Sequence, residues 1–300
     1  MSQLDNTPNT ESLSSGDVHA GVQQNVNTHF DATVAYWDEV YRGEELQGVI
    51  YQQRQTAVLR CIDEAHLPPG AHVLEIGCGA GHLTRELGRR ELSVHAVDAS
   101  PAMVEITSKG IQSHSLEDKV TVATADVHAL PFAPGTFDLV VAVGVLPWLH
   151  SPADAVVEMA RVLAPRGQVV LTADNAARLS SFTDPRAIVA LTPLRRVYHA
   201  LRNQPGDAVS YLHLPRRTDA LLRAAGLEPT ARATCGFGPL SFLGRPIMSE
   251  RAAIRLNERL RRLADRGVPG LKWTGWHYVV RAVKASPAQG SESAPAERRR

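Results

Sequence analysis

The stretch VLEIGCGAGHLTREL, from Val73 to Leu87, decides the fold of this chain. Three glycines stand on alternate positions within it, Gly77, Gly79 and Gly81. An apolar run precedes them and an amphipathic run follows, so the pattern predicts a strand, a tight glycine turn and a helix. Turns of this kind cradle nucleotides, because the backbone can approach a ligand closely where side chains are absent.

The same alternation of strand and helix continues on both sides of the turn. Strands are expected at 72–77, 93–98, 119–126, 136–145, 167–174, 228–235 and 276–284, and helices at 56–66, 82–91, 100–111, 151–163 and 217–227. Strands that alternate with helices indicate a parallel sheet covered on both faces, and the last strand alternates in the antiparallel manner. The expected fold is α/β, a seven-stranded Rossmann-like doubly wound sheet with an antiparallel last strand.

The chain divides into one domain and two tails. Residues 1–27 and 285–300 are polar and lack an apolar period, so we expect disordered tails there. The domain spans 28–284, with its core at 55–175. Two insertions, 176–217 and 236–273, exceed the usual connection length, and we expect them to form lids or pocket walls.

Composition narrows the class of protein. The 300 residues carry a formal net charge of +1, which argues against a nucleic-acid partner. Three distant cysteines without a C-x-x-C pair fit a reducing compartment and predict neither disulfides nor a zinc site. No apolar run reaches the ~18 residues of a membrane helix, and the first residues show no signal-peptide pattern, so a cytoplasmic protein is expected.

The spacing of the glycines selects among nucleotides. It is G-x-G-x-G rather than the G-x-G-x-x-G of dinucleotide-binding turns, and no G-K-[ST] follows for a triphosphate. Asp98 closes the second strand roughly 20 residues after the first glycine, where a ribose would be held. Glu75 precedes that glycine by two positions, and a carboxylate there suits a cation better than a pyrophosphate. The turn therefore predicts a nucleoside with an attached positive group.

Five blocks in order, LEIGCGAG, AVDAS, ADVHALPF, FDLVVAVGVLPWL and RVLAPRGQVVLT, resemble the motifs of class I S-adenosylmethionine-dependent methyltransferases. The resemblance covers about Ala71 to Thr172 and is greatest to the small-molecule branch that includes ubiquinone-type enzymes. It implies S-adenosylmethionine as cofactor. The cofactor residues that it implies are Glu75 at the ammonium, Gly77, Cys78, Gly79 and Gly81 at the methionine part, Asp98 at the ribose, Ala99, Met103, Asp126 and Val127 at the adenine, and Val143 at the sulfonium.

Upstream, HFDATVAYWDEVY and VIYQQRQTAVLRCIDE resemble the N-terminal helical cover of some of these enzymes, loosely that of magnesium-protoporphyrin O-methyltransferase. Tyr36, Trp37, Tyr41 and Tyr51 either close over the cofactor or serve only in packing, because aromatic residues at helical spacing are common in cores.

Methyl transfer requires an aligned acceptor and, for some acceptors, removal of a proton. His150, directly after the fourth strand, is the first candidate base, and His213 in the first insertion is the second. The alternative for His150 is a packing residue beside the helix cap at Ser151. Metal dependence is not expected, because Asp174 and Asn175 alone leave a hard divalent ion with too few oxygen ligands.

The insertions are rich in apolar residues, and we expect them to select the acceptor. An arginine-rich helix at 249–266 is either a solvated surface or a weak contact with a membrane or an acidic substrate group. The sequence thus predicts O-methylation of a small, largely apolar molecule. N- or C-methylation of a lipid or prenylated ring stays open, as does a non-catalytic nucleoside-binding module.

Overall fold

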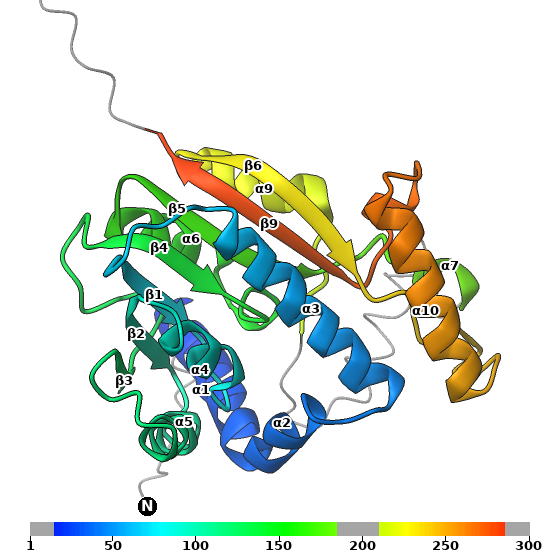
Figure 1. The fold of residues 1–300 in the computed structure, drawn as a ribbon, viewed down its shortest axis with the longest axis horizontal. Coiled ribbons are helices and arrows are strands. Elements are labelled where there is room, and N and C mark those ends of the chain that lie inside the picture. Colours follow the sequence, from blue (N-terminus) through cyan, green and yellow to red (C-terminus); the bar gives the residue numbers. More distant parts are fainter. Residues whose placement is uncertain (1–14, 185–209, 286–300) are drawn as a thin grey trace, which may run out of the picture.

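The computed structural model describes residues 15–184 and 210–285 (Figure 1). Seven strands form one sheet in the order β3-β2-β1-β4-β5-β9-β6. The strands are β1 (His72–Ile76), β2 (Ser93–Asp98), β3 (Val120–Thr124), β4 (Phe137–Ala142), β5 (Leu163–Asp174), β6 (Leu227–Cys235) and β9 (His277–Lys284). Strand β1 lies third in this order, parallel to β2 and β4, and β9 runs antiparallel to both β5 and β6. The predicted doubly wound sheet with an antiparallel last strand is confirmed.

The helices lie on both faces of the sheet. They are α1 (Ser15–Ala32), α2 (Val34–Val40), α3 (Leu46–Asp63), α4 (His82–Gly88), α5 (Pro101–Ser113), α6 (Pro152–Val162), α7 (Ser180–Thr183), α9 (Pro215–Ala224) and α10 (Glu250–Asp265), with short 3-10 turns η1 (Leu146–Trp148) and η4 (Leu271–Trp273). Two apolar clusters mark the faces, one containing Val58 of α3, Leu87 of α4 and Ile111 of α5, the other Met159 of α6 and Leu222 of α9.

The central strands are apolar along nearly their whole length, because both faces are covered. In β1 and β4 the inward and outward residues are alike buried, including Val73, Leu74, Val140 and Val141. Polar groups therefore concentrate where these strands end. Parallel strands place those ends at one edge of the sheet, and the turns that follow β1, β2, β3 and β4 meet there.

The N-terminal segment differs from the expected tail. Residues 15–32 form α1, so the prediction of a disordered tail up to residue 27 is wrong from residue 15 onward. The sequence of this segment has no apolar period, and the helix is stabilised by tertiary contacts instead. Val26 is buried, and the carboxylate of Asp31 accepts hydrogen bonds from the hydroxyl of Ser100 and the backbone N–H of Ala102. Residues 1–14 and 286–300 lie outside the described part.

The second insertion, 236–273, folds into a hairpin, a helix and a 3-10 turn. Strands β7 (Ser241–Phe242) and β8 (Arg245–Pro246) pair with each other, and α10 and η4 follow. Of the first insertion, residues 185–209 lie outside the described part. Within the ranges that the structure describes, no helix is both long enough and apolar enough to cross a membrane.

Candidate cofactor site

A cavity lies at the edge where β1 to β5 end, beneath helices α1, α2 and α3. Together with its open mouth, solvent space included, it encloses about 1230 Å³ of empty space. The residues that line it come from α1 to α3 and from the ends of all five strands, Asp174 being the contribution of β5.

The glycine turn forms the floor of the cavity. Gly77 and Gly79 line it with φ angles of +70° and +52°, and an added Cβ at Gly79 would meet nothing within 4 Å. Gly81 serves a different purpose, because it opens α4 with φ +75° and a Cβ there would lie 2.9 Å from the side chain of Thr107. Gly81 therefore permits close packing of α4 on α5 and, unlike the other predicted cofactor residues, does not line the cavity.

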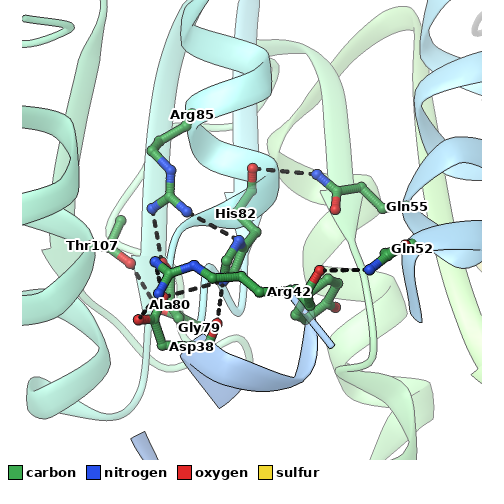
Figure 2. Close-up of polar contacts among 10 residues, drawn as sticks. Asp38, Arg42, Gln52, Gln55, Gly79, Ala80, His82, Arg85 and Thr107 are labelled. Atoms are coloured by element: carbon green, nitrogen blue, oxygen red, sulfur yellow. Dashed lines mark hydrogen bonds and ion pairs between the residues drawn. The ribbon is translucent and has the colours of Figure 1, made fainter. Parts of the chain in front are cut away.

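A polar clamp joins the turn to the N-terminal helices (Figure 2). His82 lies 3.1 Å from the backbone carbonyl of Asp38 through Nε2, and its Nδ1 lies 3.0 Å from a nitrogen of the Arg85 guanidinium. Because arginine can only donate, Nδ1 accepts, and Nε2 carries the proton that is donated to Asp38. Burial, followed by the charge of Arg85, lowers the pKa of His82, so the clamp holds the neutral ring.

Asp98 fixes the ends of β1 and β2 relative to each other. One carboxylate oxygen accepts the N–H of Gly79 at 2.9 Å, and the other accepts the N–H of Ser100 at 2.9 Å. Burial raises the pKa of Asp98, although these hydrogen bonds act in the opposite direction. Each oxygen has a second lone pair, and the side chain lines the cavity, so it can also accept from hydroxyl groups of a ligand. Ala99 and Met103 lie beside it in the same wall.

Glu75 is the most unusual carboxylate in the cavity. It is 3% exposed, and its Oε2 has no hydrogen-bond partner among the described residues. Burial raises its pKa to about 8. A buried and unpartnered acceptor is costly unless a ligand satisfies it, and a cationic group would do so best. Cys78, between Gly77 and Gly79, is also buried against the cavity.

The far end of the cavity contains Asp126 and Val127, which follow β3. Asp126 accepts the backbone N–H of His128 at 2.9 Å and lies 2.8 Å from Nδ1 of the same residue. The hydrogen bond from the His128 side chain lowers the pKa of Asp126, so this half-exposed carboxylate is ionised at neutral pH.

Arg54 of α3 also lines the cavity, although the sequence analysis did not single it out. It is 5% exposed, donates to the hydroxyl of Tyr41 at 2.5 Å and stacks on the ring of Tyr51, 4.6 Å from its centroid. Its Nε has no partner among the described residues. The sequence spacing does indicate that Arg54 is buried, because it stands four residues from Ile50 and four from Val58, on the buried face of the helix.

Asp174 lies near Arg54 at the end of β5. Its carboxylate lies 3.0 Å from Nδ1 of His277, the first residue of β9. Burial alone would raise the pKa of Asp174, but the His277 hydrogen bond and the charge of Arg54 lower it. The neighbouring Asn175 is turned away, because its amide donates to the carbonyls of Trp273 and Gly275. No group of three or more metal-ligating side chains occurs within residues 15–184 and 210–285.

Aromatic side chains form the roof. Phe30 of α1 packs edge-on against Trp148, at 5.2 Å between centroids, and Trp37 of α2 contacts both Phe30 and Tyr51. Of the four aromatic residues considered from the sequence, Trp37, Tyr41 and Tyr51 line the cavity, whereas Tyr36 does not. Val143, at the end of β4, completes the wall opposite.

Neither predicted catalytic histidine lines the cavity. The turn η1 carries the chain past the end of β4 before His150, whose ring packs 3.9 Å from that of His128 and lies 3.4 Å from Gln23 of α1. His213 is joined to β5 through its backbone N–H, 2.7 Å from the carbonyl of Asp174, and burial lowers its pKa. The geometry therefore does not support proton transfer to either ring.

The second insertion, residues 236–273, does not line the cavity either. Its helix α10 packs against α3 and β6, and the side chain of Asn257 bonds the backbone N–H of Phe237 and the amide of Gln53. The prediction that this insertion walls the pocket is wrong, because N-terminal helices that precede the motif region take that place.

Comparison with known proteins agrees with the fold. Residues 74–171 match the model of a methyltransferase domain. The chain is 32% identical to the malonyl-[acyl-carrier protein] O-methyltransferase of Halorhodospira halophila over 160 residues, covering 53% of this chain and 50% of that protein. It is 28% identical to the mitochondrial ubiquinone biosynthesis O-methyltransferase of Schizosaccharomyces pombe over 180 residues, covering 58% and 64% respectively.

Among solved structures, magnesium protoporphyrin IX methyltransferase from Synechocystis PCC 6803 with bound SAH superposes with a TM-score of 0.57 at 18% identity, covering 88% of this chain and 100% of that one. This likeness concerns the fold. The chain spans about half to two thirds of the length of the curated relatives named above. Residues 74–171 therefore carry a methyltransferase domain, and the chain is similar to class I S-adenosylmethionine-dependent methyltransferases of the small-molecule branch.

Proposed function

We propose that this protein binds S-adenosylmethionine in the cavity and transfers its methyl group to a small, largely apolar acceptor. The observation that carries the proposal is a pair of buried groups, one acidic and one basic, without full hydrogen bonding. The carboxyl group of Glu75 and the guanidinium of Arg54 both line the cavity, and each has an unpartnered polar atom among the described residues. An amino acid tail, with its ammonium and its carboxylate, complements this pair.

The remaining residues fit the nucleoside part. Asp98 offers lone pairs to the two ribose hydroxyls, and Ala99 and Met103 give the adenine an apolar wall. Asp126, ionised, accepts from the adenine amino group, while Val127 supplies backbone beside the ring. Gly77, Cys78 and Gly79 let the backbone approach the methionine part, and Gly81 supports them by setting α4 against α5.

Bound S-adenosylmethionine supplies an electrophilic methyl group on its sulfonium. The protein contributes alignment and exclusion of water. Val143 borders the place expected for the sulfonium, and the aromatic roof of Phe30, Trp37 and Trp148 excludes solvent. In place of His150 and His213 we assign proton acceptance to Asp174, whose carboxylate faces the cavity and is oriented by His277.

O-methylation is the preferred chemistry, because the two curated relatives named above are O-methyltransferases and a carboxylate such as Asp174 can hold an acceptor hydroxyl. N- or C-methylation of a lipid or prenylated ring is the alternative within the class. The alternative from a different class of protein is a non-catalytic nucleoside-binding module. The free thiols of Cys61, Cys78 and Cys235 support a reducing compartment, so we place the reaction in the cytoplasm.

Calorimetry tests the cofactor half of the proposal. S-adenosylhomocysteine should bind the wild type more tightly than 5′-methylthioadenosine, which lacks the amino acid tail. Arg54→Met should weaken S-adenosylhomocysteine by roughly tenfold or more, the value of a hydrogen bond to a charged group, and leave methylthioadenosine unchanged. Tight binding of NADH in place of S-adenosylhomocysteine would overturn the assignment.

Methyl-labelled S-adenosylmethionine in a small-molecule extract tests the transfer. We expect label in an apolar, hydroxyl-bearing product, and Asp174→Asn should lower its rate without changing the affinity for S-adenosylhomocysteine. Cofactor binding without any labelled product across extracts and acceptor panels would favour the non-catalytic module.

A further inference from the structure

Large apolar side chains are exposed together at one end of the molecule. Phe242 and Leu243 of the β7–β8 hairpin are 53% and 57% exposed, and Ile247, just after it, is 50% exposed. Phe182 of α7, the helix that packs against β7, is 69% exposed. Soluble surfaces carry single exposed apolar residues routinely, but a group of this kind marks an interaction site.

The hairpin is held in a defined conformation by strand pairing and hydrogen bonds. Phe242 pairs with Arg245, so Leu243 and Gly244 form a two-residue turn, and their φ angles are +51° and +81°. This turn type favours Asn-Gly, whereas a leucine at positive φ is strained. The carboxylate of Asp184 accepts from the hydroxyl of Ser241 at 3.0 Å and the N–H of Gly244 at 2.9 Å. The turn thus exposes Leu243 to solvent even though its positive φ strains the backbone.

Helix α10 directly follows the hairpin and carries a cationic stripe. Ala253, Asn257 and Ala264 are buried on its inner face. The opposite face holds five exposed arginines at helical spacing, Arg251, Arg255, Arg259, Arg262 and Arg266. None of the five forms an ion pair within 4 Å with any residue that the structure describes. This concentration of charge stands out in a chain whose formal net charge is only +1.

The apolar tip and the arginine stripe are neighbours along the chain, and we call them together the tip–stripe surface (Phe182, Phe242, Leu243, Ile247 and the five arginines). Arg245 lies in the hairpin itself, and the four Cα–Cα steps from Ile247 to Arg251 span at most ~14 Å. The start of α10 is joined to the start of α3, since Glu250 accepts the N–H of Leu46 at 3.1 Å.

We propose that the tip–stripe surface binds the surface of a lipid bilayer that contains anionic lipids. Apolar side chains partition into the boundary between headgroups and acyl chains, and arginines nearby gain from the negative surface potential. The apolar groups occupy a protruding turn rather than the centre of a flat patch, which favours insertion between headgroups over docking on an acidic protein. The proposal does not depend on the proposed methyl transfer.

Vesicle co-sedimentation of the full chain tests the proposal. We expect the wild type to sediment with phosphatidylcholine vesicles containing roughly one third phosphatidylglycerol and to stay in solution with phosphatidylcholine alone. Raising the salt from about 0.1 M to about 1 M should release it, because the screening length falls from about 10 Å to about 3 Å. Arg251→Gln with Arg255→Gln should weaken binding about fivefold per arginine.

The apolar contribution is tested with Phe242→Ser combined with Leu243→Asn, which should weaken binding tenfold or more. Asparagine suits the positive φ at this position, so the variant keeps the turn, and unchanged thermal unfolding would exclude misfolding. Matched controls on other helices are Arg216→Gln with Arg217→Gln, two exposed arginines of α9, and Val157→Ser, an apolar residue 56% exposed on α6. These should bind vesicles as the wild type does.

Three results would overturn the proposal. The first is equal loss of binding in the control pair, which would show attraction by net charge alone. The second is full binding by the Phe242 and Leu243 variant. The third is a wild type that binds neither vesicle while still binding S-adenosylhomocysteine, which would leave the cofactor assignment intact and redirect the arginine stripe to an acidic protein.

Discussion

At the scale of single residues, Glu75 makes the most specific prediction. Its pKa of about 8 means that the unliganded protein holds a proton on this carboxyl at pH 7. A ligand ammonium beside it lowers that pKa, so binding of S-adenosylhomocysteine should release up to about one proton. Calorimetry in two buffers of different ionisation enthalpy measures this number. Glu75→Gln should bind with no proton release, and equal release in both proteins would assign the proton to another group.

Leu243 makes a second prediction at this scale, now for stability. Its φ of +51° in the two-residue turn strains a leucine, and asparagine adopts this conformation more readily. Leu243→Asn alone should raise the free energy of unfolding by roughly 0.5–1 kcal/mol, measured by urea denaturation. Leu212→Asn, at an exposed leucine without positive φ, serves as the control and should change stability little. A destabilised Leu243→Asn protein would show that the leucine makes contacts that outweigh the strain.

At the scale of elements, the clamp of Figure 2 determines how firmly the N-terminal helices cover the glycine turn. His82→Ala removes the hydrogen bond to the carbonyl of Asp38 and the acceptor for Arg85. We expect faster amide hydrogen exchange in α2, with a loss of about 1 kcal/mol in the local opening free energy. His114→Ala, at the end of α5 and bonded only within its own neighbourhood, should leave exchange in α2 unchanged.

The packing of the elements explains which residues of the site the sequence could predict and which it could not. The glycine turn, Asp98 and Asp126 follow strand ends at short range, so spacing alone brought them to one edge. Arg54 and Trp37 reach the cavity through packing of helices that lie before β1, and no local pattern fixes that packing. His150 was placed by its distance from β4 along the chain, and the single turn η1 redirects it toward His128.

At the scale of the whole molecule, four histidines that are buried or half-buried make stability depend on pH. Burial lowers the pKa of His82, His95, His213 and His277 below the 6.5 of an unfolded chain. The unfolded state therefore takes up protons more readily, so their contribution is complete above pH 6.5 and is lost as the pH falls below it. The contribution of Glu75 to the free energy of unfolding has the opposite dependence on pH. It falls as the pH rises from 4.5 to about 8, because the folded state holds the proton of this carboxyl more tightly than the unfolded state does.

Denaturation in a Glu75→Gln background isolates the histidines. The free energy of unfolding should fall between about pH 6.5 and pH 5.5 by at most about 1.4 kcal/mol per histidine and pH unit. His277→Gln should reduce this slope while His114→Ala, an exposed site, should not. A flat profile would mean that these rings take up protons in the folded protein as readily as in the unfolded chain.

The aromatic roof over the cavity also bears on which step limits the rate of turnover. Phe30 packs against both Trp37 and Trp148 above the floor, and we expect a spent cofactor to leave when α1 and α2 move away from η1. Motions of this size are slower than many chemical steps and often limit enzymes with closing lids. We therefore expect a burst: one methyl group per protein molecule is transferred rapidly, and later ones follow at the pace at which the roof reopens.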